Sequence, residues 1–308
     1  MTPIKALSSE HLSELIDENI AEHGNDCSLN HIDVSAVTDM DGLFQNIDFQ
    51  GDISQWNTSN VTSMKEMFAN CSFNGDISQW DTSNVRDMTG MFAYSQFNRD
   101  LSRWDTSKVV EMAWMFMENA FNGDISNWNT SNVHDMSYMF SRSQFTGDIS
   151  KWNTSSLRDM RGMFLDTQFN GDISQWDTSN VTNMESMFCN SKFNGDISKW
   201  NVHRVINIAS MFKNCPFRGN ISRWDLTNVE YAQEVFTSFQ DNLPGYLGVL
   251  QGEYGLPENF PQAALFHQVR ALAEGLGLDP MGTARFIARE MHKPELVLDL
   301  SISLDFSS

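Results

Sequence analysis

Tryptophan recurs along this chain at a fixed interval, and that interval constrains the fold more than any other feature. Eight tryptophans follow one another at a spacing of 24 residues: Trp56, Trp80, Trp104, Trp128, Trp152, Trp176, Trp200 and Trp224. Ile32 holds the same position one period before the first of them, so the array begins there. Such spacing is typical of repeat proteins, whose small units cannot bury an apolar face alone and bury it by stacking.

Each unit predicts two short elements. Val61, Met64, Met67 and Phe68 fall at i, i+3, i+6 and i+7, which is the apolar stripe of a short helix. The preceding Asn-Thr-Ser-Asn supplies N-cap side chains, and an acid such as Asp87 then lies near the helix start. A brief strand at Asp-Ile-Ser follows a Phe-Asn-Gly turn, whose glycine we expect to need positive φ. The prediction is an α/β solenoid, and a right-handed β-helix without a helix per coil is the alternative.

The pattern divides the chain into three parts. Residues 1–31 carry an apolar stripe over 7–23, which predicts an N-terminal capping helix. Residues 32–239 form the solenoid of about eight to nine coils, each with a short strand and a short helix. Residues 240–308 begin with a Gly- and Pro-rich linker and then predict a helical hairpin and one strand, which together make a small α/β module.

The hairpin in residues 240–308 has two interpretations. Its turn, with Ala273 in the first helix and Gly277 four residues later, is similar to that of a helix-turn-helix, and Arg285 and Arg289 lie on the second helix. A DNA-binding adaptor is therefore one alternative. DNA binding requires neutralisation of phosphates, however, and the module is acidic. A cap on the last coil is the favoured interpretation.

The whole unit also resembles a known repeat. The pattern W-D-T-S-N-V-T-D-M-x-x-M-F, followed by F-N-x-D-I-S-x-W, is similar to the repeats of the BspA-like leucine-rich-repeat family. The segment from Leu29 to Phe44 is similar to the usual N-terminal start of that family. The resemblance covers about 200 residues. It implies a leucine-rich-repeat-like α/β solenoid, and it implies no catalytic residues, because the family is mostly of unknown function.

The charge and cysteine content narrow the class of protein. The net charge of −20 repels nucleic acid and anionic membranes, and it suits a basic protein partner or a mimic of nucleic acid. No apolar run is long enough to span a membrane, and the N-terminus has no apolar signal region. The four cysteines, Cys27, Cys71, Cys189 and Cys215, lack C-x-x-C spacing. We therefore expect a cytoplasmic protein with free thiols and with no metal or cofactor.

No enzyme motif is present in the sequence. The seven histidines show no zinc-protease spacing, and there is no G-x-S-x-G, P-loop or G-x-G-x-x-G. A column of aspartates is the strongest polar feature: Asp52, Asp76, Asp100, Asp124, Asp148, Asp172 and Asp196. A calcium ladder and a phosphate-like stripe are possible uses, but one acid per unit favours a carboxylate that accepts backbone N–H bonds in its own turn. The sequence predicts no enzyme.

A binding site is expected where the units differ. The tenth position after each tryptophan lies opposite the apolar stripe of the expected helix, and Trp114 occupies it in one unit. We predict one exposed apolar patch made by Tyr94, Trp114, Met117 and Tyr138. A polar rim would be supplied by Glu118, Arg142, Arg158 and Arg161. The alternative is that these are tolerated surface residues or that they cover a groove between the expected helices.

These observations predict a non-enzymatic protein–protein interaction module that uses the outer face of the solenoid. The expected partner is another protein, and the acidic charge suits a basic one. An acidic inhibitor that mimics nucleic acid is the alternative of another class. The sequence leaves the identity of the partner and the oligomeric state open.

Overall fold

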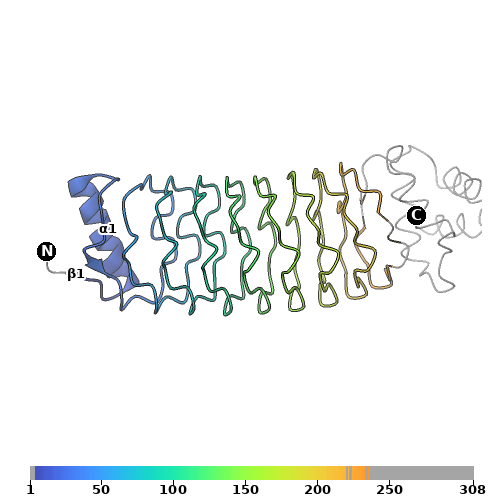
Figure 1. The fold of residues 1–308 in the computed structure, drawn as a ribbon, viewed down its shortest axis with the longest axis horizontal. Coiled ribbons are helices and arrows are strands. Elements are labelled where there is room, and N and C mark those ends of the chain that lie inside the picture. Colours follow the sequence, from blue (N-terminus) through green and yellow to red (C-terminus); the bar gives the residue numbers. More distant parts are fainter. Residues whose placement is uncertain (1–3, 220, 222–223, 233–234, 236–308) are drawn as a thin grey trace, which may run out of the picture.

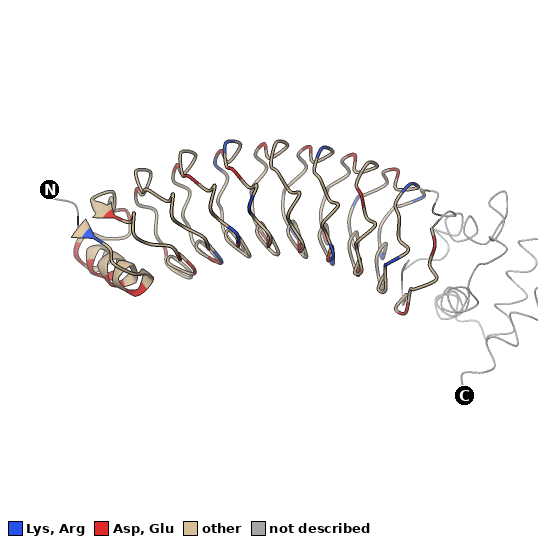
Figure 2. Ribbon diagram, turned by 90° about the horizontal axis from the view of Figure 1, so that it is seen from below, with Lys and Arg blue, Asp and Glu red and all other residues tan. Residues whose placement is uncertain are grey.

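The computed structural model describes residues 4–219, 221, 224–232 and 235. Within them, helices and strands are confined to β1 (Ile4–Lys5), α1 (Ser9–His23) and β2 (Ile32–Asp33), and β1 pairs with β2 in parallel. The 24-residue units lie side by side as successive coils, with α1 at the N-terminal end (Figure 1). The row of coils bends into a shallow arc, and acidic residues occur along its whole described length (Figure 2). The chain is therefore a repeat protein whose units stack.

Helix α1 covers the first coil. The Ser8 side chain accepts a hydrogen bond from the His11 N–H at 3.2 Å, and the helix ends at Gly24, which has a φ of 87°. Leu12, Leu15 and Ile16 are buried and join the same core as the coils. The helix thus falls where the sequence predicts one, over residues 7–23. The hairpin and strand expected in residues 240–308 lie outside the described residues.

The coils contain no helix in the described part of the array, so the predicted strand plus helix per unit is wrong. The segment from Val61 to Phe68 begins as irregular backbone with a bridge at Ser63 and continues into turns from Lys65 onward. The Met67 N–H donates to the Met64 carbonyl at 3.2 Å within the coil, whereas the Glu66 N–H donates to the Thr89 carbonyl of the next coil at 2.8 Å. Because alternate N–H groups bond to the next coil, an i to i−4 helical ladder cannot form.

Strand pairing between coils is also minimal. Single parallel bridges join one residue per coil, as at Ser63–Asp87 and Asp87–Glu111, and the predicted strand at Asp-Ile-Ser is irregular in most units. In lacking a helix, the coil is closer to the right-handed β-helix that the sequence left open as the alternative. The backbone is satisfied by hydrogen bonds between coils and by short turns within each coil, rather than within a sheet or a helix.

Three aromatic columns fill the core. Trp56 and Trp80 stack at 6.2 Å between ring centroids, and Phe68 stacks on the phenylalanine of the next coil at 5.7 Å. Phe73 lies 4.4 Å from Phe68 and begins the third column within the same coil. The Trp80 indole N–H donates to the Ile53 carbonyl of the preceding coil at 3.2 Å. The predicted ladder of Val, Met, Phe, Ile and Trp is confirmed by the burial of these columns.

The glycine column has a different cause from the one predicted. Gly75 and its equivalents do not have positive φ, in contrast to Gly90. A Cβ atom at Gly75 would lie 2.7 Å from the Phe73 ring. The column therefore favours glycine because the phenylalanine ring packs directly against the backbone, although Arg99 occupies the same position in one coil. The expectation of a left-handed turn at this glycine is wrong.

The ladder makes a testable prediction about stability. Trp128 is 4% exposed, donates to the Leu101 carbonyl at 3.1 Å and stacks on Phe116 at 6.2 Å. We expect Trp128→Ala to lower the free energy of unfolding by about 3–5 kcal/mol, because it removes a buried ring from between coils. Urea unfolding followed by circular dichroism measures the loss. Trp114→Ala, at an outward tryptophan, is the matched control, and equal losses would contradict this assignment of the core.

Candidate functional site

Two columns of each coil turn outward because their backbone is left-handed. The tenth and fourteenth residues after each tryptophan from Trp56 to Trp200 have φ between 49° and 61°, and among them are Tyr94, Trp114 and Tyr138. A residue with a Cβ atom loses roughly 1–2 kcal/mol in this conformation. The conformation persists because the N–H groups of these residues bond to the next coil, as in Trp114 to the Ser137 carbonyl at 2.8 Å. These side chains are thus held outside the core.

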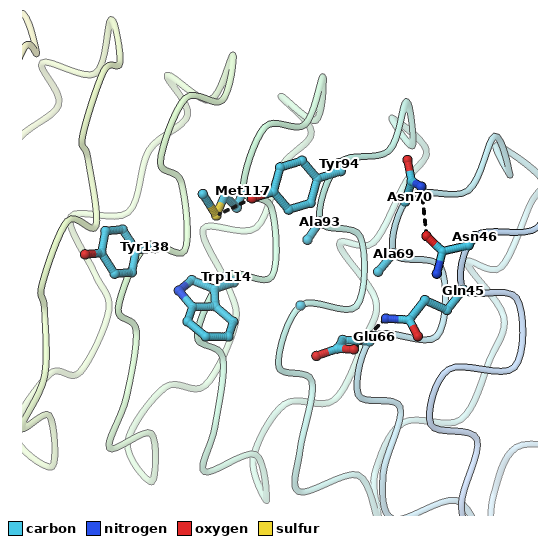
Figure 3. Close-up of a pocket in the computed structure, with 11 residues that line it drawn as sticks. Gln45, Asn46, Glu66, Ala69, Asn70, Ala93, Tyr94, Trp114, Met117 and Tyr138 are labelled. Atoms are coloured by element: carbon cyan, nitrogen blue, oxygen red, sulfur yellow. Dashed lines mark hydrogen bonds between the residues drawn. The ribbon is translucent and has the colours of Figure 1, made fainter.

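The structure brings the four predicted site residues together. Tyr94, Trp114, Met117 and Tyr138 all line one groove with a volume of about 490 Å³ (Figure 3). The Trp114 and Tyr138 rings lie 6.5 Å apart, and the Tyr94 hydroxyl donates to the Met117 sulfur at 3.6 Å. Tyr94 is 50% exposed and Trp114 is 39% exposed. Hence the aromatic surface is accessible, and Trp114 is not buried between coils.

Tyr138 is fixed in place by the following coil. A Cβ atom at Gly162 would lie 2.2 Å from the Tyr138 ring, so the ring occupies the space that this glycine leaves empty. The Arg161 guanidinium carbon lies 5.2 Å from the centre of the same ring. A cation at this distance is attracted to an aromatic face. The Tyr138 end of the groove is therefore a pre-formed wall.

The expected polar rim forms only in part. Arg142 donates to Glu118 at 2.9 Å and to Asp166 at 3.2 Å, which joins three successive coils. Arg161 contacts the outer wall at Tyr138. Arg158 is exposed, and like Glu118 and Arg142 it is not among the residues that line the groove, so Arg161 is the expected rim residue that contacts the groove wall.

Small residues create the groove, and sequence reasoning missed them. The small residues that line it are Ala69, Gly90 and Ala93. Four larger polar residues line it as well: Gln45, Asn46, Glu66 and Asn70. Ala93 precedes Met117 by one coil in the same column, and Gly90 likewise precedes Trp114. Large side chains on one coil and small ones on the coil before leave a hollow between them. This drop in side-chain size between adjacent units is a signal that the sequence does contain.

The end of the groove away from Tyr138 is polar. The Gln45 amide donates to Oε2 of Glu66 at 2.6 Å, and the Asn70 amide donates to Oδ1 of Asn46 at 2.8 Å. The Cγ atom of Glu66 lies 3.1 Å from where a Cβ of Gly90 would be, so the Glu66 side chain extends over this glycine. Figure 3 shows its carboxylate between Gln45 and Trp114. The groove thus has an aromatic end and a carboxylate end.

The aspartate column accepts backbone hydrogen bonds, as the sequence predicts. The Ser78 N–H donates to Oδ1 of Asp76 at 2.9 Å, and the same bond recurs in each coil from Asp52 to Asp196. This backbone bond, followed by one from the serine hydroxyl, lowers the pKa of Asp76. No group of three or more metal-binding side chains occurs among the described residues. The column serves the turns.

A second acidic column lies on the bridge residues. Asp87, Glu111, Asp135 and Asp159 follow one another through parallel bridges, and they do not lie at helix starts as predicted. Burial raises the pKa of Glu111, and the charges of Asp135 and Asp87 raise it further. Burial likewise raises the pKa of Asp159. Desolvation and like charges disfavour the ionised forms of Glu111 and Asp159, so the ionisation of these two groups opposes folding at neutral pH.

Other features point away from thiol chemistry in the described residues. Cys71 and Cys215 are buried, and this burial raises the pKa of both thiols. A reactive thiolate needs the opposite environment. Separately, the described residues contain no helix whose length and apolarity would let it cross a membrane.

Comparison with known proteins places the chain in a family. The family described as "Mycoplasma protein of unknown function, DUF285" matches residues 11–119, 73–168, 93–190 and 142–246, overlapping segments that span most of the chain. The chain belongs to this family. The four overlapping matches agree with the repeat structure of the array. No curated protein and no solved structure matches it.

The left-handed backbone of this DUF285 array makes a prediction at Trp114, which has a φ of 59°. Trp114→Gly should be more stable than Trp114→Ala by about 0.5–1 kcal/mol. Glycine removes the strain that a Cβ atom causes in the left-handed conformation, and this gain exceeds the backbone entropy that glycine loses on folding. Gly90 and Gly162 already occupy this column at similar φ. Chemical unfolding of the two variants compares them. A more stable alanine variant would show that the backbone at this position is not left-handed.

Replacement of a buried acid in the bridge column should increase the stability of the fold, and the increase should depend on pH. The pKa of Asp159 is raised in the folded state, so its ionisation opposes folding above that pKa and the penalty vanishes as the pH falls below the unfolded value of about 4. Asn183 holds the equivalent position and its side chain accepts the Glu185 N–H at 3.1 Å, so asparagine suits the column. Asp159→Asn should raise the melting temperature at pH 7 and lose that advantage near pH 4.

Asp76→Asn is the matched control, because the pKa of Asp76 is lowered. Its ionised form favours folding, so the substitution should lower the melting temperature at pH 7 and have no effect at a pH well below 4. Melting curves across this range test both variants. The same sign for both at pH 7 would contradict the assignment.

Proposed function

We propose that the stack is a solenoid related to the BspA-like leucine-rich repeats, and that it binds another protein without catalysing a reaction. The contact surface in this proposal is the groove lined by Tyr94, Trp114, Met117 and Tyr138. The observation that carries the proposal is the gathering of these four side chains, from three successive coils, on one accessible groove. Accessible aromatic and methionine side chains are enriched in protein interfaces and supply most of their binding energy.

The cost of the site supports this proposal. Trp114 and Tyr138 occupy a left-handed column that takes glycine in two nearby coils, Gly90 and Gly162. Bulky residues there add nothing to the buried core and carry backbone strain. A binding role gives these aromatics a use that stability does not.

The charge favours a basic partner. The whole chain has a net charge of −20, and a field of this sign raises the association rate of a cationic protein. The Arg142 guanidinium lies between two carboxylates, Glu118 and Asp166, so the rim offers little free positive charge. Binding should therefore weaken as the salt concentration rises.

Mimicry of nucleic acid is the alternative. It would use the exposed aspartate column, whose members recur once per coil. Cations accompany that column, however. The pKa of Asp100 is lowered mainly by hydrogen bonds from the Ser102 N–H and hydroxyl, and the charge of Arg103 lowers it further. The charge of Lys199 likewise lowers the pKa of Asp196. Interleaved positive charge weakens a phosphate-like field, and for this reason we prefer protein binding.

A paired substitution tests the proposed function. Trp114→Gly combined with Tyr138→Gly should abolish capture of the protein that the full chain recovers from an extract of its own cells, while the melting temperature stays close to that of the parent. Truncation of an interface anchor commonly costs about 2 kcal/mol or more. Quantitative pull-down with both proteins measures capture.

Asp124→Asn combined with Asp148→Asn, on the aspartate column, is the control pair for the alternative. Loss of capture with this pair and not with the groove pair would favour the acidic column as the binding surface. Capture unchanged by the groove pair would refute the proposal.

A further inference from the structure

The groove contains a hollow that is shaped and charged for one kind of side chain. Its floor is Ala69, Ala93 and Gly90, where the coils present the least side chain. Glu66 and Trp114 close it on two sides, since they lie one coil before and one coil after Gly90 in the same outward column. Figure 3 shows the carboxylate and the indole facing across this gap.

The carboxylate at this hollow has capacity for a donor. Oε2 of Glu66 accepts the Gln45 amide at 2.6 Å, and Oε1 accepts no hydrogen bond from the part of the chain that the structure describes. Among the groove-lining residues, Glu66 is the one carboxylate, and none is a lysine, arginine or histidine. Arg161 contacts the wall at the Tyr138 end, where its guanidinium packs on that ring. Negative charge at the Glu66 end is therefore not compensated within the groove.

We infer that this hollow takes an arginine side chain of the partner protein. The planar guanidinium would donate to Oε1 of Glu66 while its face lies on the indole of Trp114, and its aliphatic stem would cover Ala93. Arginine suits this site better than lysine, because the guanidinium both stacks on aromatic rings and forms directed bonds to carboxylates, and it is less strongly hydrated. This inference rests on the proposed function and adds the chemistry that the groove recognises.

A neutral ligand fits the site less well. A sugar would use several neutral donors and acceptors beside the aromatic rings, and the amide groups at this end are already partly engaged, Gln45 with Glu66 and Asn70 with Asn46. The acidic net charge also adds nothing to the capture of a neutral ring. Oligosaccharide binding is accordingly an outcome of the test.

The test uses the full chain and a defined probe, the peptide Gly-Gly-Arg-Gly-Gly blocked at both ends. Binding is followed by NMR through the indole N–H signal of Trp114, identified as the signal that Trp114→Gly removes. We expect the arginine peptide to shift this signal in a saturable manner. The same peptide with citrulline, which keeps the shape and loses the charge, should bind about tenfold more weakly or worse.

Two variants locate the peptide in the hollow. Glu66→Gln keeps an oxygen for the Gln45 amide but removes the charge, and it should weaken the arginine peptide about tenfold without altering the melting temperature. Ala93→Met places in the floor the side chain that Met117 has one coil later, and it should block the peptide by filling the hollow. Equal binding of arginine and citrulline peptides, or no effect of Glu66→Gln, would overturn the inference.

The experiment separates this inference from the proposed function. If maltotriose or cellotriose shifts the Trp114 signal and the arginine peptide does not, the arginine site is refuted. If the peptide fails while the Trp114→Gly and Tyr138→Gly pair still abolishes capture of the partner, the arginine site alone is refuted. If that pair leaves capture unchanged, the proposed function is refuted as well.

Discussion

The structure depends on hydrogen bonds between one coil and the next. In each unit, alternate N–H groups donate to carbonyls 23 residues later, as from Glu66 to Thr89 and from Phe68 to Met91, at 2.8 and 2.9 Å. The intervening N–H groups close short turns within the coil, as from Met67 to Met64. Every coil must therefore repeat the backbone of its neighbour, because a shift in either would leave buried polar groups unpaired. The aromatic columns follow from this register, since it places equivalent rings about one coil apart.

The same register creates a surface that is separate from the core. To send alternate N–H groups forward, the tenth and fourteenth residues after each tryptophan adopt positive φ, from Glu66 to Asn214. Most of their side chains lie on the surface, so the fold constrains their backbone but hardly their chemistry. Trp114, Tyr138 and Gly162 occupy one column within three coils with φ of 55–59°. The array can thus change its surface without changing its interior.

The sequence predicted the stacked core and the four groove residues but not the local backbone. A spacing of i, i+3, i+6 and i+7 fits two helical turns, yet successive three-residue turns return Met64 and Met67 to the same face equally well. Eight residues are too few for periodicity to separate these cases. The carbonyl that accepts the Glu66 N–H lies 23 residues away, so no local pattern reveals it. The prediction of positive φ at Gly75 is wrong for a similar reason. Glycine is favoured there because the Phe73 ring packs against the backbone, and not because of the φ angle of Gly75 itself.

The groove was found only in part because it is defined as much by missing side chains as by large ones. Trp114 and Met117 attract attention in a sequence, whereas Gly90 and Ala93 look like ordinary variation. Yet Gly90 allows Glu66 to extend toward the indole, and without that gap the aromatic residues would form a wall and not a site. In a repeat protein the shared residues specify the coil, so residues that differ between neighbouring coils are the ones that are free to contact a partner. Glu66, Gly90 and Trp114, which follow one another in the same column of three successive coils, show such a difference in side-chain size and charge.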